Sequence, residues 1–149
     1  MSTWPELFAA HVQARPDAIA VVFEDESLTY AELDARANRL ANRLVAEGAG
    51  PERFVALAVP RSTDMIVAEV AVLKSGAAYL PIDTDYPADR IAYMLSDASP
   101  VCLVTTDGLL SRLPETLPRL SLDDPEVWAG SADAPAGPVA VTNAAYVIY

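Results

Sequence analysis

Asp83 and Asp85 are the residues whose types and spacing come closest to a chemical site. They stand one residue apart in the segment IDTDYP, directly after an apolar run of strand length. The carboxyl ends of parallel strands are where α/β sheets place functional groups, so the pair could contact a metal ion or a ribose hydroxyl. The favoured interpretation is simpler: the two aspartates set a turn before residues 86–87 and cap the following helix.

The other candidates for chemistry have ordinary structural explanations. Cys102, the single cysteine, lies in the apolar run VCLVT and is predicted to be buried rather than nucleophilic, because the one histidine, His11, belongs to a separate segment. Neither GxGxxG nor GxxxxGK[ST], the patterns that cradle phosphates, occurs in the sequence. Glycines in 48–51 and 74–76 are explained as helix stops, and the aspartates of 123–125 as a solvated turn. The residues alone therefore assign no catalytic, cofactor-binding or metal-binding position.

Composition places the chain among globular proteins of single-domain size. Its 149 residues are 52% apolar and 21% charged, and the formal net charge is −11. This acidic balance argues against nucleic acid or an anionic membrane surface as a partner, because both would repel it. No segment approaches the roughly 18 uninterrupted apolar residues of a membrane span, and the first residues lack the features of a signal peptide. We therefore predict a cytoplasmic protein.

The elements that must position any site alternate between helical and strand periodicity. Helices are predicted at 4–16, 29–50, 62–76 and 87–99, and strands at 18–24, 27–30, 53–60, 77–83 and 101–105. The clearest helix begins at a capping box formed by Thr29 and Glu32 and ends at Gly48. The apolar run at 53–60 is typical of a strand covered on both faces. The alternation predicts an α/β fold, layered on a largely parallel sheet with right-handed crossovers.

The periodicity is lost between Pro114 and Pro138. Five prolines and two glycines fall in this stretch, which predicts a surface excursion holding at most one short strand, in LPRLSLDDPEVW. The chain then closes on NAAYVIY, whose last five residues, 145–149, predict a further strand. A strand of this kind usually feeds a turn or loop, so we expect these residues to be the front part of something longer.

Two stretches resemble a known family. LTYAELDARANRLA at 28–41 and VLKSGAAYLPIDTDYPADRIAYMLSDA at 72–98 closely resemble the first two core motifs of the amino-acid-activating adenylation domains of nonribosomal peptide synthetases, which belong to the acyl-adenylate-forming ligases. The segments PELFAAHVQARPDAIAVVFEDESLTY and NAAYVIY are also similar to that family. The resemblance implies that residues 1–149 are the N-terminal part of the large adenylation subdomain, with 114–138 a proline-rich excursion and the sheet incomplete without downstream segments.

The resemblance implies a function for a longer parent. Such a parent forms aminoacyl-AMP from an amino acid and ATP, then loads it on the phosphopantetheine thiol of a carrier protein in antibiotic or siderophore biosynthesis. In the family, the strand similar to AYVIY runs into a Thr/Ser/Gly-rich loop that wraps the ATP phosphates, and this sequence stops before that loop. The implied ligands, ATP and Mg²⁺, and the implied partners therefore belong to the parent: the remainder of the adenylation domain, a carrier protein and, in many relatives, a small MbtH-like protein. Residues 1–149 alone are predicted to be inactive.

Two alternatives stay open on the sequence. One is a fragment of an acyl-CoA synthetase-type ligase, which has the same adenylation chemistry with a carboxylic acid and coenzyme A. The other is a non-catalytic interaction module that uses the same scaffold. The segment LKSGAAYLPID favours the peptide-synthetase branch, and the residues that follow Tyr149 would separate all three.

Overall fold

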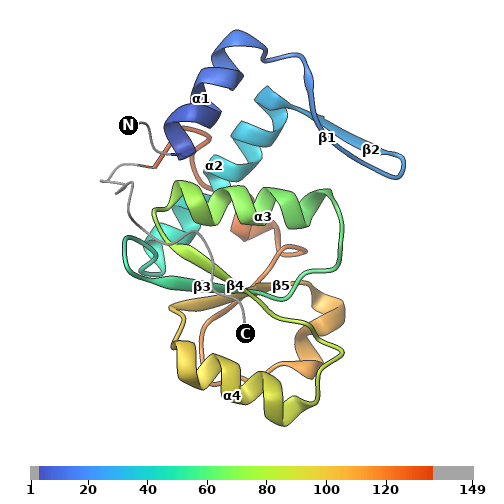
Figure 1. The fold of residues 1–149 in the computed structure, drawn as a ribbon, viewed down its shortest axis with the longest axis vertical. Coiled ribbons are helices and arrows are strands. Elements are labelled where there is room, and N and C mark those ends of the chain that lie inside the picture. The colour runs from blue at the N-terminus through green and yellow to red at the C-terminus, as the bar shows by residue number, and fades with distance from the viewer. Residues whose placement is uncertain (1–3, 136–149) are drawn as a thin grey trace.

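A four-stranded parallel sheet forms the centre of the computed structural model, which describes residues 4–135 (Figure 1). The elements in chain order are α1 (Trp4–Ala14), β1 (Ile19–Phe23), β2 (Glu26–Thr29), α2 (Tyr30–Ala46), β3 (Phe54–Leu57), α3 (Thr63–Lys74), β4 (Ala78–Pro81), α4 (Ala88–Ala98), β5 (Cys102–Thr105), η1 (Asp107–Arg112), β6 (Arg119–Ser121) and η2 (Pro125–Trp128). The strands lie in the order β4-β3-β5-β6, and every neighbouring pair is parallel. The predicted α/β fold is confirmed, and β1 and β2 form a separate antiparallel hairpin.

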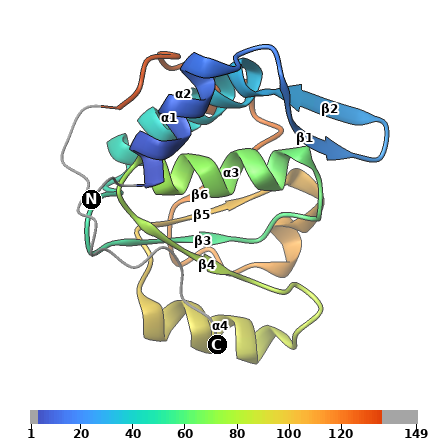
Figure 2. The same ribbon diagram turned by 45° about the horizontal axis from the view of Figure 1, so that its top comes forward.

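Helices cover both faces of the sheet. In Figure 2, α2 and α3 lie above the strands and α4 lies below them. Strand β3 contributes side chains to both layers. Val55 and Leu57 belong to the apolar cluster of α2 and α3, whereas Ala56 belongs to the cluster of α4. This alternation follows from the two-residue period of a strand. The prediction that this strand is covered on both faces is confirmed.

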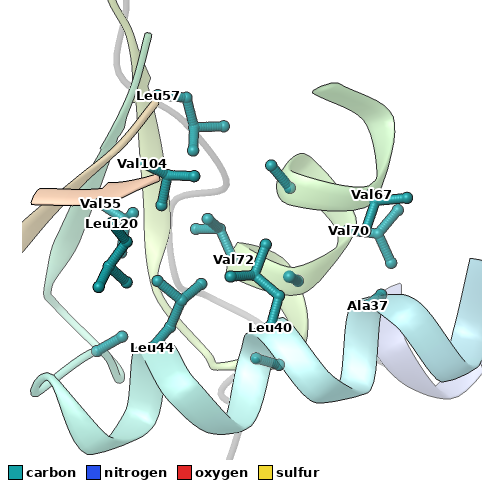
Figure 3. Close-up of a cluster of buried hydrophobic side chains, with 14 of the residues drawn as sticks. Ala37, Leu40, Leu44, Val55, Leu57, Val67, Val70, Val72, Val104 and Leu120 are labelled. Carbon is teal, nitrogen blue, oxygen red and sulfur yellow. The ribbon is translucent and has the colours of Figure 1, made fainter. Parts of the chain in front are cut away.

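Helix α2 forms as its local signals predict. The Thr29 hydroxyl accepts a hydrogen bond from the Glu32 amide at 3.1 Å, and the Glu32 carboxylate accepts one from the Thr29 amide at 3.0 Å. The chain leaves the helix through Gly48, which has a φ of 106°, a conformation that favours glycine. Leu40 and Leu44 of the apolar face are fully buried against α3 and the sheet (Figure 3). Burial of each such leucine stabilises the fold by about 2 kcal/mol.

The proline-rich stretch contributes to the core as well as to the surface. The short strand expected there is β6, which pairs in parallel with β5. Leu120, Leu122 and Val127 are buried in the same cluster as α2 and α3. Residues 129–134 are exposed, and three of their carbonyl oxygens accept hydrogen bonds from Asn38 and Asn42 of α2. Part of the stretch therefore extends the sheet, and part follows the outside of α2.

Two sequence predictions concern residues that the structure does not describe. The strand predicted at 145–149 lies outside them, as does the end of the proline-rich stretch. Within residues 4–135, none of the helices combines the length and the apolar character that crossing a membrane requires.

Candidate functional site

Asp83 and Asp85 form a turn at the carboxyl end of β4. The Asp83 carboxylate accepts a hydrogen bond from the Asp85 amide at 2.9 Å, and the Asp83 carbonyl accepts one from the Tyr86 amide at 3.1 Å. Both aspartates are exposed. The turn is confirmed, but the predicted cap is wrong: Pro87 occupies the N-cap position of α4, and no side chain caps that helix. The pair therefore has a local structural role.

Cys102 and the other minor candidates take the places predicted for them. Burial, with a smaller contribution from the negative charge of Glu47, raises the pKa of the Cys102 thiol to about 12, so the thiolate needed of a nucleophile is scarce at neutral pH. Asp124 caps η2 by accepting a hydrogen bond from the Glu126 amide at 3.0 Å. Ser75 and Gly76 end α3 as expected. These residues shape the fold.

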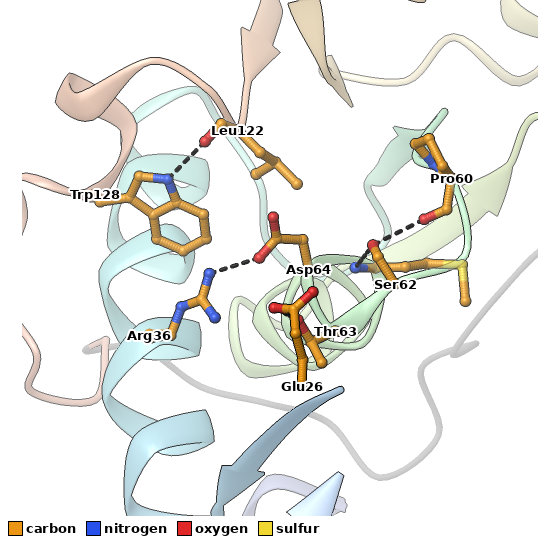
Figure 4. Close-up of polar contacts among 9 residues, drawn as sticks. Glu26, Arg36, Pro60, Ser62, Thr63, Asp64, Leu122 and Trp128 are labelled. Atoms are coloured by element: carbon orange, nitrogen blue, oxygen red, sulfur yellow. Dashed lines mark hydrogen bonds and ion pairs between the residues drawn. The ribbon is translucent and has the colours of Figure 1, made fainter. Parts of the chain in front are cut away.

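A polar cluster lies at the start of α3, after the carboxyl end of β3; the sequence predicted the start of this helix but not the distant partners of its first residues (Figure 4). The Ser62 hydroxyl accepts a hydrogen bond from the Met65 amide, which caps the helix. The buried Thr63 hydroxyl donates to Glu26 of the hairpin at 3.1 Å. Asp64 pairs with Arg36 of α2 at 2.5 Å. One helix terminus thus connects α2 and the hairpin.

Lys74 forms a second connection that sequence reasoning missed. It is the last residue of α3, and it is 8% exposed. Its ammonium group lies 2.6 Å from a carboxylate oxygen of Asp34 and 5.1 Å from the ring centroid of Phe8. A buried ammonium requires such a partner. The signal in the sequence is that Lys74, the one lysine of the chain, directly follows the largely apolar run IVAEVAVL.

A pocket of about 320 Å³ lies at the carboxyl ends of β3 and β4. Met65 and Glu69 of α3, Tyr79 of β4 and Met94 of α4 line it, and Tyr86 lies at the turn beyond β4. Burial raises the pKa of the Glu69 carboxyl, and a hydrogen bond from the Tyr79 hydroxyl offsets part of that rise. Of all the titratable groups in the described residues, this one best combines a cavity with an altered pKa.

Among residues 4–135, no cluster of metal ligands is present, and four of the positive side chains are already paired. No group of three or more His, Cys, Asp or Glu side chains that could hold a metal ion occurs among residues 4–135. Within the same range Arg36, Arg43, Lys74 and Arg119 each pair with a carboxylate of the chain itself, so none of the four offers its charge to a triphosphate. Phosphate chemistry requires such positive groups. We therefore derive no catalytic step from this part of the chain.

Comparison with known families gives the class of protein. Residues 8–149 match the family described as AMP-binding enzyme, which is nearly the whole chain. The chain therefore belongs to the AMP-binding enzyme family. Both the parallel sheet and the helices on its two faces agree with that assignment.

The relatives place the chain within that family. A dimodular nonribosomal peptide synthase of Bacillus subtilis (strain 168) is 52% identical over 97% of this chain, which spans 7% of that protein. The solved structure of the nonribosomal peptide synthetase FmoA3 has a TM-score of 0.91 at 31% identity, over 99% of this chain and 16% of the other. A Mycobacterium tuberculosis fatty acyl CoA synthetase has a TM-score of 0.86 at 24% identity, over 97% of this chain and 32% of the other, a likeness of fold alone. The chain thus spans a small part of the proteins it matches.

Proposed function

We propose that residues 1–149 are the N-terminal part of the large subdomain of an adenylation domain, with 114–138 as an excursion within it. The single observation that carries this proposal is the similarity to a nonribosomal peptide synthase, which is 52% identical over 97% of this chain. The chain spans 7% of that protein. The alternative of an acyl-CoA synthetase has weaker support, because the likeness to the fatty acyl CoA synthetase is 24% identical. No observation on the described residues favours a separate interaction module.

The proposed parent activates an amino acid for peptide synthesis. Its substrate carboxylate attacks the α-phosphorus of ATP, which releases pyrophosphate and leaves aminoacyl-AMP. The thiol of a carrier protein then attacks the acyl carbon and displaces AMP. The parent supplies the residues that bind ATP and Mg²⁺, and its partners are a carrier protein and, as a further possibility to test, an MbtH-like protein. The family to which the chain belongs supports this ligase activity.

The proposed role of these residues is to build the sheet that supports the site. All four strands of the sheet run parallel, so their carboxyl ends meet at one edge, where α/β proteins bind their ligands. The ion pairs of Asp64 and Lys74 hold α2 and α3 to each other on one face of that sheet. A support of this kind fixes the positions of groups that other segments contribute.

Pyrophosphate exchange tests the proposal. The 149-residue chain and a longer polypeptide from the same gene are each incubated with ATP, labelled pyrophosphate and single amino acids. We expect exchange that depends on one or a few amino acids from the longer polypeptide and none from the 149 residues. Exchange by the 149 residues would contradict their proposed inactivity. Acyl-CoA formation without amino-acid-dependent exchange by the longer polypeptide would favour the acyl-CoA synthetase instead.

A further inference from the structure

The pocket at the carboxyl ends of β3 and β4 has a composition that no part of the proposed function uses. Its floor and walls are largely apolar, and they include the side chains of Met65 and Met94. Two acidic residues, Glu69 and Asp83, are among those that line it. Two tyrosines, Tyr79 and Tyr86, also line the pocket. Such a concave apolar site with a few convergent polar groups is where small ligands bind.

Glu69 is the group that determines what the pocket can hold. It lies on α3 one turn after Met65, and it is half-buried. Among residues 4–135, none of the ion pairs of the structure involves Glu69, and its side chain accepts a hydrogen bond from the Tyr79 hydroxyl. A partly desolvated carboxylate with one neutral donor gains most from a cation, because a charged donor makes a stronger hydrogen bond than a neutral one.

The other walls fit a cation that carries apolar atoms. Tyrosine faces attract ammonium and guanidinium groups, and Tyr86 is 42% exposed at the rim, where an entering ligand meets it. Methionine side chains adapt to the shape of an aliphatic stem. The volume of about 320 Å³ lies at the lower end of the range for ligand pockets, so it suits a group the size of one long side chain. An anion is disfavoured by Glu69 and by Asp83 on the rim.

We propose that this pocket binds an organic cation with a short apolar stem, a guanidinium or ammonium group of the size of an arginine or lysine side chain. Glu69 is the anchoring carboxylate, and Tyr86 covers the bound cation. Free amines and the basic side chains of a polypeptide share this chemistry. The proposal does not depend on the proposed adenylation function, because it concerns residues that lie within the chain itself.

Methionine-methyl NMR of the 149-residue chain reports on the pocket directly. The chain has three methionines, and two of them, Met65 and Met94, line the pocket. The probes are Nα-acetyl-arginine amide, agmatine and Nα-acetyl-citrulline amide, which has the shape of the first probe without its charge. We expect saturable shifts of both pocket methyls with the two cations and none with the citrulline compound. Tighter binding of the arginine amide indicates a polypeptide side chain as the ligand, and tighter binding of agmatine indicates a free amine.

Two variants and one control test the roles of the residues. Glu69→Gln keeps the shape of the side chain and is expected to weaken binding at least about tenfold, since it removes a charged hydrogen bond. Tyr86→Leu is expected to weaken binding about threefold. Glu126→Gln makes the same change of charge at an exposed position of η2 and is expected to leave the affinity unchanged. Circular dichroism verifies that each variant is folded.

Three results would overturn the proposal. The first is the absence of saturable shifts at the two pocket methyls with both cations. The second is binding of the citrulline compound as tightly as the arginine amide, which would make the charge irrelevant. The third is a folded Glu69→Gln variant that binds the cations as tightly as the unchanged chain. Equal loss of cation affinity in Glu69→Gln and Glu126→Gln would also overturn the proposal, because it would show that affinity depends on the net charge of the chain and not on Glu69.

Discussion

Arg36 and Asp64 join α2 to α3 through an ion pair of 2.5 Å, and the same guanidinium lies 5.2 Å from the ring centroid of Trp128. The indole N–H of Trp128 in turn donates a hydrogen bond to the Leu122 carbonyl at 2.9 Å. Three segments that are distant in the sequence therefore meet at one arginine. The contact holds η2, the last helical element among the described residues, against α2.

Loss of this arginine is expected to destabilise the fold moderately. Arg36→Met keeps most of the apolar stem but removes the ion pair and the contact with the indole ring. Because both charged groups are partly exposed, we expect a decrease of about 1 kcal/mol in the free energy of unfolding, measured by urea denaturation. Arg90→Met is the matched control, since Arg90 lies 5.5 Å from the centroid of the exposed Tyr93 ring on α4. An equal effect of the two substitutions would contradict the role given to Arg36.

Asp34 is expected to matter because it is the partner of a buried ammonium. Asp34→Ala leaves the Lys74 ammonium buried without its carboxylate, and we expect a loss of about 2 kcal/mol in urea denaturation. Addition of Lys74→Met should restore part of this stability, since the double variant contains no unpaired buried charge. The pair of Arg43 and Glu47 provides a control, because its cation is 38% exposed whereas Lys74 is buried: Glu47→Gln should cost about 0.5 kcal/mol or less. A double variant less stable than Asp34→Ala would show that the lysine is not the source of the cost.

Thiol reactivity tests the burial of Cys102. Burial raises the pKa of the Cys102 thiol from 9.0 to about 12, so little of it is thiolate at pH 8. The Cys102 side chain is also fully buried. We expect 5,5′-dithiobis(2-nitrobenzoic acid) to react with the folded chain at least about a hundredfold more slowly than with the chain in urea. Equal rates in the two conditions would mean that the thiol is accessible in the folded chain.

The raised pKa of Glu69 makes a prediction about stability and pH. Burial disfavours the ionised form in the folded chain, so ionisation costs stability once the pH exceeds the ordinary pKa of 4.5. We expect Glu69→Gln to be more stable than the unchanged chain at pH 7, and the two to converge below pH 4.5, where the glutamate is protonated in both states. Thermal unfolding at pH 7 and pH 4 measures the difference. A variant that is less stable at pH 7 would show that the carboxylate stabilises the fold.

A stabilising Glu69→Gln substitution would also bear on function. Groups that are kept at a cost in stability are common at binding sites. The same variant is expected to lose affinity for organic cations, so the two measurements together distinguish a binding residue from a merely tolerated one. A variant that is more stable and binds unchanged would identify Glu69 as tolerated.

The sequence predicted the elements whose signals are local. Helix α2 carries its capping box, apolar face and terminal glycine within one segment, so its bounds follow from neighbouring residues. The burial of β6 and η2 has no such signal, because it depends on β5 and α2, which lie elsewhere in the chain. The cap expected from Asp83 or Asp85 failed because Pro87 already fixes the first turn of α4.

The candidate site was harder to predict than the fold. Its key group is Glu69, a single acidic residue within the apolar run IVAEVAVL, and the sequence does not show which neighbour it faces. The register of β3 and β4 and the turn after β4 bring Tyr79 and Tyr86 to it. Ion pairs such as those of Arg36 and Lys74 are hidden for the same reason, since their partners are 28 and 40 residues away.

Successive side chains of β3 face opposite sides of the sheet, which makes the fold sensitive to an insertion in this strand. Val55 and Leu57 face one apolar layer and Ala56 faces the other, so one additional residue inside this strand would exchange the side chains presented to the two helical layers. Large groups would then press on α4, and small ones would leave space beneath α2 and α3. Because this one strand contributes buried side chains to the apolar clusters on both faces of the sheet, a single insertion in it would disturb both clusters at once.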